Sequence, residues 1–296
     1  MADLPQIIET VRLPVNIQVH PYLLDHRFEG KAVFPAVEAM QILARSVKEF
    51  APQTDITATA DITFEKFLFI PPGTKKIDAL CSIASFENGN ISAVLQTKTR
   101  AKKAAFTRIK GHATVHYPRI KLAVAAGARS PLSFEESGGL EISPDQIYRE
   151  LVPFGPAYQN ISEDLTIHKN GALAKLRAPT ISEAIENTGQ LGSPFVLDAA
   201  FHAACVWGQR YCGVVAFPVG VKKRTIVKPT RPGDTYISTA LPVRTDSDML
   251  IFDIYICDED NTLFESAIGV HMRDVSAGRL KPPAWIIEAG GKSNLA

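Results

Sequence analysis

The chain has 296 residues, 46% of them apolar, which is enough to bury a large core and falls between one large domain and two small ones. Its net charge of +1, without a basic or an acidic tail, argues against nucleic acid and anionic membranes as partners. No apolar run approaches the roughly 20 residues of a membrane-spanning helix. A soluble, compact globular enzyme is therefore expected.

The cysteines and the first residues indicate a reducing compartment. Cys81, Cys205, Cys212 and Cys257 lie too far apart for a C-x-x-C metal site. The opening residues, MADLPQIIET, lack the basic start and the apolar core of a signal peptide. We therefore expect four reduced thiols in a cytoplasmic protein.

The first half is expected to contain one long helix followed by several strands. A strand-like, proline-interrupted pattern covers Val11–Asp25, and Pro35 then starts a helix that Pro52 ends. Apolar side chains recur along this helix at intervals of three and four, at Ala36, Met40, Leu43, Ala44 and Val47. Strand patterns follow over Asp55–Phe69, Lys76–Phe86, Ile91–Thr99 and Phe106–Tyr117.

The second half repeats this plan after a segment rich in alanine, glycine and serine. We place the first half at residues 1–117, a linker at 118–142 and the second half at 143–296. Ser143-Pro144 is expected to begin a short helix, and Ser193-Pro194 a longer one that ends near Gly208 or Gly213. Strand patterns follow over Val214–Val227, Asp234–Val243, Met249–Cys257 and Leu263–Asp274. Helices followed by runs of strands predict an α+β fold.

Three motifs lie in this framework. They are the run from His26 through Gly30 to Pro35, the run from Leu197 through Asp198 to His202, and the loop Phe154–Gln159. Together, and in this order, they resemble the dehydratase domain of modular polyketide synthases and polyunsaturated fatty-acid synthases. The resemblance covers about Val19 to Val275 and implies a double hot-dog fold, in which two sheets wrap two central helices and the active site lies between the halves.

The resemblance also implies roles for individual residues. His26 is the expected catalytic histidine, Asp198 the expected acid, and His202 the residue that orients the aspartate and shares its helix face. The expected substrate-binding residues are Gly30, Phe34, Pro35, Phe154, Gly155, Pro156, Tyr158 and Pro218. Phe154 departs from the tyrosine usual in the family, so that any contact made by the tyrosine hydroxyl is missing here.

These residue types suit removal of water from a 3-hydroxyacyl thioester. The hydrogen on C2 is weakly acidic and hydroxide is a poor leaving group, so a base and an acid must act on adjacent carbons. Neutral His26 would take the C2 proton, and Asp198, kept protonated by an apolar pocket, would donate to the leaving oxygen. Backbone amides near Phe34–Val37 would stabilise the charge on the thioester oxygen.

Structural interpretations compete with these roles for single residues. A lone histidine before a helix is more often structural, but an unpaired carboxyl in the apolar helix around Asp198 is costly to bury. His112 and His116 share a strand face without a third ligand, so no metal site is expected.

Two basic clusters are candidates for docking an acidic acyl carrier protein rather than ordinary solvated surface. One is the hairpin around Lys98, Arg100, Lys102, Lys103, Arg108 and Lys110. The other, Lys222-Lys223-Arg224, is preferred because it is nearer the motifs in the sequence.

The sequence as a whole predicts a 3-hydroxyacyl thioester dehydratase without metal or redox cofactor, supplied by the phosphopantetheine arm of an acyl carrier protein. It is either a discrete protein or one domain of a larger one, and the strand around Val11–Val19 favours a homodimer. Two alternatives stay open. One is a product-template-like cyclase or double-bond isomerase on the same fold, and the other is a non-catalytic acyl-binding module.

Overall fold

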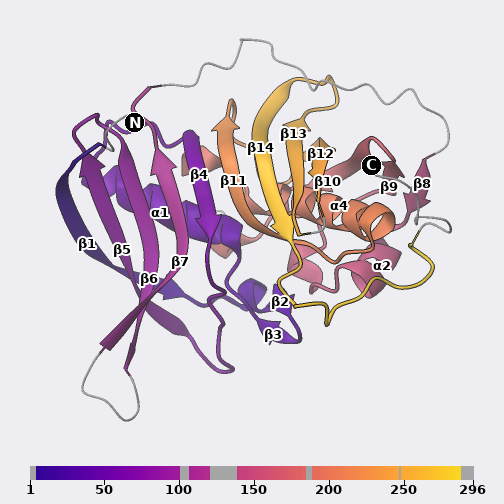
Figure 1. The fold of residues 1–296 in the computed structure, drawn as a ribbon, viewed down its shortest axis with the longest axis horizontal. Coiled ribbons are helices and arrows are strands. Elements are labelled where there is room, and N and C mark those ends of the chain that lie inside the picture. Colours follow the sequence, from indigo (N-terminus) through magenta and orange to yellow (C-terminus); the bar gives the residue numbers. More distant parts are fainter. Residues whose placement is uncertain (1–4, 101–106, 121–138, 185–188, 247, 288–296) are drawn as a thin grey trace.

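A computed structural model describes the chain except residues 1–4, 101–106, 121–138, 185–188, 247 and 288–296. Its main element is a twelve-stranded antiparallel sheet with the order β1-β5-β6-β7-β4-β11-β14-β13-β12-β10-β9-β8. Figure 1 shows this sheet curving around two long helices, α1 in the first half and α4 in the second. The predicted α+β fold class is therefore confirmed.

The strands and helices have the following bounds. The strands of the large sheet are β1 (Ile7–Gln18), β4 (Ala58–Phe64), β5 (Lys76–Phe86), β6 (Ile91–Arg100), β7 (Thr107–Tyr117), β8 (Leu140–Ile142), β9 (Leu165–His168), β10 (Gly171–Arg177), β11 (Phe217–Ile226), β12 (Thr235–Thr245), β13 (Leu250–Cys257) and β14 (Leu263–Arg273). A small hairpin consists of β2 (Arg27–Phe28) and β3 (Lys31–Ala32). The helical segments are η1 (Pro21–Asp25), α1 (Ala36–Phe50), α2 (Pro144–Gln146), η2 (Ile147–Leu151), η3 (Pro156–Tyr158), η4 (Gly189–Leu191) and α4 (Pro194–Cys212).

The two halves share one sheet because β4 of the first half pairs with β11 of the second. Ile62 lies opposite Val221, and Thr59 lies opposite Arg224. Most of the expected linker, 118–142, lies outside the described residues, although β8 occupies its end. The domain boundaries at 117 and 143 therefore stay predictions.

Helix α1 follows the predicted pattern. Pro35 is its N-cap residue, and its fixed φ suits the entry into a helix. Met40, Leu43, Ala44 and Val47 are all buried, while Arg45 and Glu49 face solvent. This amphipathic helix covers the inner face of β5, β6 and β7.

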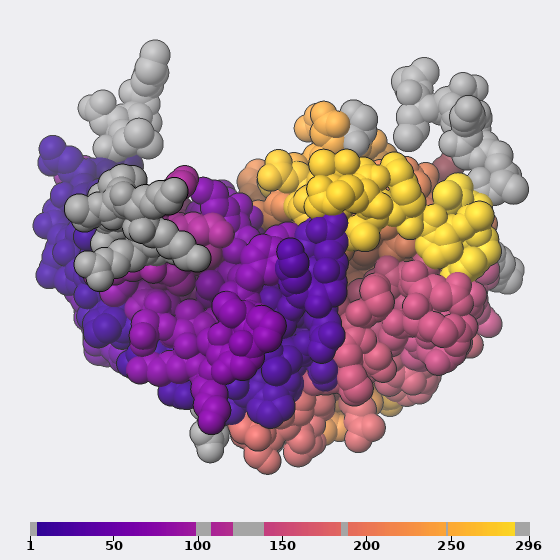
Figure 2. All heavy atoms as spheres, turned by 90° about the horizontal axis from the view of Figure 1, so that it is seen from below, coloured from indigo at the N-terminus to yellow at the C-terminus, as the bar shows by residue number. Residues whose placement is uncertain are grey.

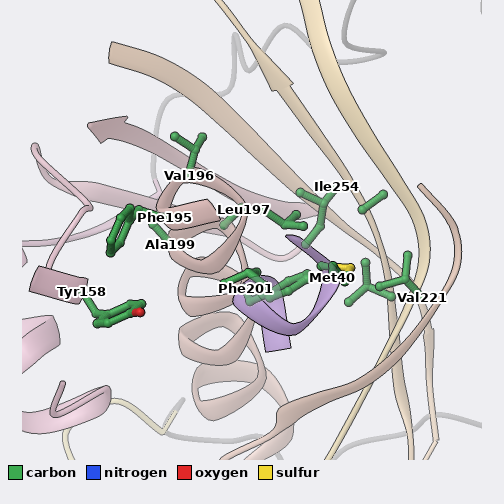
Figure 3. Close-up of a cluster of buried hydrophobic side chains, with 14 of the residues drawn as sticks. Met40, Tyr158, Phe195, Val196, Leu197, Ala199, Phe201, Val221 and Ile254 are labelled. Carbon is green, nitrogen blue, oxygen red and sulfur yellow. The ribbon is translucent and has the colours of Figure 1, made fainter. Parts of the chain in front are cut away.

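Helix α4 is buried on all sides from Pro194 to Gln209. Met40 of α1, Val221 of β11 and Ile254 of β13 lie on one side of it, and Tyr158 lies on the other (Figure 3). It ends at Gly213, whose φ of 64° is the left-handed conformation that glycine adopts most easily. Among the described helices, none is both long and apolar enough to cross a bilayer.

Three strands were not predicted. β8, β9 and β10 are three to seven residues long and lie between the two capped helices. Short runs of this kind carry little periodicity, and their pairing with β12 at the far edge of the sheet is a tertiary contact. The other predicted strands agree with the observed ones to within a few residues at each end.

The chain after β14 crosses back over both halves. Arg279 donates to Glu29 at 2.7 Å, which ties this segment to the β2–β3 hairpin. Farther on, Ile286 is fully buried, and the Trp285 indole donates to Glu150 at 2.6 Å. Figure 2 shows these yellow residues lying against the indigo N-terminal ones and the pink segment of the second half.

A buried carboxyl, that of Glu38, lies between the two long helices. The Tyr22 hydroxyl donates to its Oε1 at 3.2 Å, and only 4% of Glu38 is exposed. Burial is the main cause that raises the pKa of Glu38 to about 7, and the charge of Asp198 adds to it. The folded protein therefore holds this proton more tightly than the unfolded chain does.

Because the folded pKa is the higher one, Glu38 lowers stability as the pH rises from 4.5 through 7. We expect Glu38→Gln to remove about 2–3 kcal/mol of this loss, since one pKa unit corresponds to about 1.4 kcal/mol. Urea unfolding at pH 5 and pH 8 measures it. Glu49→Gln, the same change at an exposed position of α1, is the control. Equal pH dependence in all three proteins would contradict the prediction.

Candidate active site

His26 is held in one tautomer by the backbone. It follows η1, and its Nδ1 lies 3.0 Å from the carbonyl oxygen of Val33. Because a carbonyl oxygen only accepts, Nδ1 carries the proton of the neutral ring and Nε2 keeps the lone pair. The hairpin that brings Val33 back to His26 turns at Gly30, whose φ is +74°. Gly30 thus has the turn role open to glycine, and its side-chain position contacts nothing.

Asp198 and His202 meet on one face of α4, one turn apart. His202 Nε2 lies 2.9 Å from Asp198 Oδ2, and the other carboxyl oxygen, Oδ1, lies 3.9 Å from Nε2 of His26. The side chain of Asp198 is 7% exposed and that of His26 16%. The structure therefore brings together the three residues predicted to be catalytic, one from the first half and two from the second.

The electrostatics of the cluster differ from one expectation. Burial lowers the pKa of the His26 imidazole, which favours the neutral ring that a base needs. Burial acts on Asp198 in the opposite sense, but the nearby His202 and His26 outweigh it, and its pKa lies below the ordinary value. The apolar surroundings therefore do not by themselves keep Asp198 protonated, contrary to the expectation from the sequence.

Phe154 lies between the two histidines. Its ring is 4.5 Å from the His26 ring and 4.9 Å from the His202 ring, measured between centroids. An apolar ring in this position excludes water from both imidazoles. Where the family usually has a tyrosine, this chain thus has an aromatic contact without a hydroxyl.

A cavity of about 960 Å³ opens at this cluster. Six of the predicted site residues line it: His26, Phe34, Phe154, Asp198, His202 and Pro218. Its walls come from both halves, with Phe64 and Leu95 on one side and Leu250 and Met272 on the other. The cavity is large enough for an extended acyl chain.

Five of the predicted substrate-binding residues do not line this cavity. Pro35 caps α1, and Gly155 packs so closely on Asp25 that a Cβ atom there would lie 2.4 Å from its side chain. Pro156 begins η3, and Tyr158 is fully buried behind His26 at a ring distance of 5.2 Å. These residues and Gly30 shape the backbone or support His26, and they do not face the cavity.

The amides expected to stabilise an oxyanion are only partly available. Phe34 N–H donates to the Leu68 carbonyl at 2.8 Å, so it is already used. Ala36 and Val37 occupy the first turn of α1, where amides have no acceptor within the helix, and Ala36 lines the cavity. These two amides are therefore the donors that this structure offers.

The predicted docking cluster at Lys222, Lys223 and Arg224 needs correction. Arg224 is 3% exposed, and its Nε donates to Glu265 at 2.7 Å inside the protein. A guanidinium buried in this pair cannot face a docking partner. Lys222 is exposed and Lys223 half-buried, but neither lines the cavity.

Other residues at the cavity were not predicted. Phe201 and Cys205 follow Asp198 by three and seven residues, so the helical period that links Asp198 to His202 would have placed them on the same face. Lys66, Lys110 and His112 also line the cavity, through the packing of the β4–β5 loop on β7. Nothing in their sequence spacing indicates this position.

Comparison with known proteins gives a family match. The profile described as "Polyketide synthase dehydratase N-terminal domain" matches residues 128–282, just over half of the chain. The chain belongs to the polyketide synthase dehydratase family. This confirms the resemblance inferred from the motifs and the class of enzyme.

Two curated relatives are much longer proteins. The dehydratase is 24% identical to a polyunsaturated fatty acid synthase of Thraustochytrium over 72% of the chain, and 23% identical to a polyketide synthase of Streptomyces halstedii over 69%. The chain spans only 8% and 3% of the lengths of these relatives.

Two solved structures show the same fold. The dehydratase domain from the CurF module of curacin polyketide synthase matches with a TM-score of 0.72 and 19% identity, over 92% of this chain and 96% of that one. A trans-AT dehydratase domain from Brevibacillus brevis matches with a TM-score of 0.71 and 21% identity, over 90% and 94%. The double hot-dog architecture of the dehydratase is thereby confirmed.

Removing the Phe154 ring tests its effect on His26. Phe154→Ala admits water beside the imidazole, so we expect the pKa of His26 to rise towards its ordinary value, with a loss of stability of about 3 kcal/mol. NMR titration of the His26 ring protons measures the shift. Phe264→Ala, which removes a ring that packs on Tyr236 instead, should leave it unchanged. An unaltered pKa in Phe154→Ala would show that the ring does not control hydration there.

Proposed function

We propose that this chain removes water from a 3-hydroxyacyl thioester to give the 2-enoyl thioester, in polyketide or fatty-acid biosynthesis. The observation that carries the proposal is the pair formed by His26 Nε2 and Asp198 Oδ1. The two atoms lie 3.9 Å apart at one cavity, and they come from opposite halves of the fold. Membership of the dehydratase family supports the reaction, and the geometry supplies the residues.

The tautomer of His26 assigns the base. Nε2 carries the lone pair and faces the cavity cluster, so it takes a proton from C2 of the substrate. The C3–O bond then breaks with the electron pair on oxygen, the proton of Asp198 goes to that oxygen, and water leaves. A double bond between C2 and C3 remains.

The pair resets without an outside proton. After the reaction His26 holds the C2 proton and Asp198 is a carboxylate, so transfer from Nε2 to Oδ1 restores the starting form. One proton thus belongs to the cluster as a whole. The lowered pKa of Asp198 makes it a ready acceptor only when His26 is protonated, and His202 beside it keeps the carboxyl oriented.

Charge on the thioester oxygen falls to the α1 terminus. The free amides of Ala36 and Val37, with the positive end of the helix dipole behind them, suit an oxyanion at the cavity wall. With both proton transfers supplied by side chains, the proposed reaction uses no metal and no redox cofactor.

The proposal includes an acyl carrier protein that presents the substrate on its phosphopantetheine arm. A cytoplasmic setting accompanies it, in keeping with four free cysteines. A homodimer is also proposed, because β1 is an edge of the sheet and its Ile7 and Ile8 are more than half exposed.

We move the proposed docking surface to the cavity mouth beside β7. Lys66 and Lys110 line the cavity there, whereas Lys222 and Lys223 do not. An acidic carrier that approaches this side would place its arm at the opening.

Lys110→Glu is expected to raise KM for the carrier-bound substrate about tenfold, because one favourable charge contact becomes a repulsive one. KM for the corresponding pantetheine thioester, which lacks the carrier, should not change. Steady-state kinetics with both substrates measures the difference. Lys222→Glu is the matched control, and a larger effect of that variant would return docking to the β11 cluster.

The reaction itself is tested by mass spectrometry of 3-hydroxyacyl groups loaded on a carrier protein. Wild type should lose water, and His26→Ala and Asp198→Asn should be slower by roughly a hundred- to ten-thousand-fold. A cyclised product from a polyketone without turnover of 3-hydroxyacyl substrate would favour the cyclase. Tight carrier binding without turnover, unaltered in His26→Ala, would favour the acyl-binding module.

A further inference from the structure

One hydroxyl group touches the catalytic cluster from outside the cavity. Tyr148 lies on η2, which continues the short helix capped by Ser143, and it is 6% exposed. Its hydroxyl oxygen lies 3.5 Å from Nδ1 of His202, and the two rings meet edge to face at 5.8 Å. Tyr148 does not line the cavity, so it does not reach the substrate.

The backbone around Tyr148 determines the direction of its proton. The N–H of Ile161 donates to the hydroxyl oxygen at 2.9 Å, and the backbone of Asn160 contributes a second hydrogen bond that also favours negative charge on this oxygen. A tyrosine oxygen that accepts from backbone amides still has one proton to donate. His202 Nδ1 is the acceptor that lies in reach.

This direction selects the tautomer of His202. If Nδ1 accepts from Tyr148, the ring proton must be on Nε2, which lies 2.9 Å from Asp198 Oδ2. The opposite tautomer would place the Nε2 lone pair against a carboxyl oxygen, which is repulsive. We propose that Tyr148 is a positioning residue, whose hydroxyl fixes the tautomer of His202 and through it the orientation of the Asp198 carboxyl. For its effect on catalysis this inference rests on the proposed dehydratase function.

The cluster thereby has a backbone anchor at each end. At one end the Val33 carbonyl holds the proton on Nδ1 of His26, and at the other the Ile161 amide holds the hydroxyl of Tyr148. Between them, each imidazole presents Nε2 to a different oxygen of Asp198. One histidine offers that carboxyl a lone pair, and the other offers it a proton.

The tautomer is measured without substrate. In ¹⁵N-histidine-labelled wild type, the His202 signals should show a protonated Nε2 and an unprotonated Nδ1. Tyr148→Phe should convert them to averaged shifts of a mixture. Tyr236→Phe is the matched control, because it removes another buried hydroxyl that accepts a backbone N–H, from Arg231 at 2.7 Å, with no catalytic histidine beside it. A protonated Nδ1 in wild type, or unchanged His202 shifts in Tyr148→Phe, would overturn the proposal.

Kinetics then test the route of the effect. Tyr148→Phe should lower kcat about tenfold with KM unchanged, in the range found for residues that orient a group contacting the reacting atoms. In a His202→Gln background, where the amide donates without help from Tyr148, the same change should have no further effect. An equal tenfold loss in both backgrounds would show that Tyr148 acts by another route.

The two readouts separate this inference from the proposed function. If wild type fails to dehydrate any substrate, the NMR experiment still decides whether Tyr148 sets the tautomer. If wild type turns over and the His202 signals do not depend on Tyr148, the function stands and the positioning role fails.

Discussion

The site depends on a carboxyl group carried into the core by a helix that is buried on all sides. Asp198 can stay there only if polar partners offset its loss of hydration. His202 comes from the same helix and His26 from the other half of the molecule. The requirement to satisfy one buried carboxyl therefore helps to bring the halves together at the place where chemistry is proposed.

The rest of the architecture keeps these partners in register. β4 and β11 join the halves into one sheet, and α1 lies beside α4 with Met40 and Glu38 between them. A second buried carboxyl, Glu38, lies near enough to Asp198 for their charges to interact. The interior thus contains two acids with opposite pKa shifts, because Asp198 has imidazoles beside it whereas Glu38 has a tyrosine hydroxyl.

Much of this could be predicted from the sequence because the signals are local. The helix at Pro35, the caps at Ser143 and Ser193, and the spacing from Asp198 to His202 are each set within a few residues. What could not be predicted depends on contacts between distant segments. Arg224 looks like a surface cation until Glu265 on the neighbouring strand is placed beside it.

The same limit applies to the cavity and to the proton inventory. Phe154, Gly155 and Pro156 are adjacent in the sequence, yet only Phe154 faces the cavity, because Gly155 packs against Asp25 from the first half. The lowered pKa of Asp198 likewise follows from the positions of two rings and not from the apolar residues around it in the sequence.

The segment after β14 shows where the folded unit ends. A fragment cut at the last strand would keep every strand of the sheet and all three residues of the catalytic cluster. It would lose the Arg279–Glu29 ion pair at the hairpin that carries Val33 back to His26, and it would uncover the surface that Ile286 fills. For anyone who trims such a domain out of a longer polypeptide, the boundary is therefore set by these contacts and not by the end of the sheet.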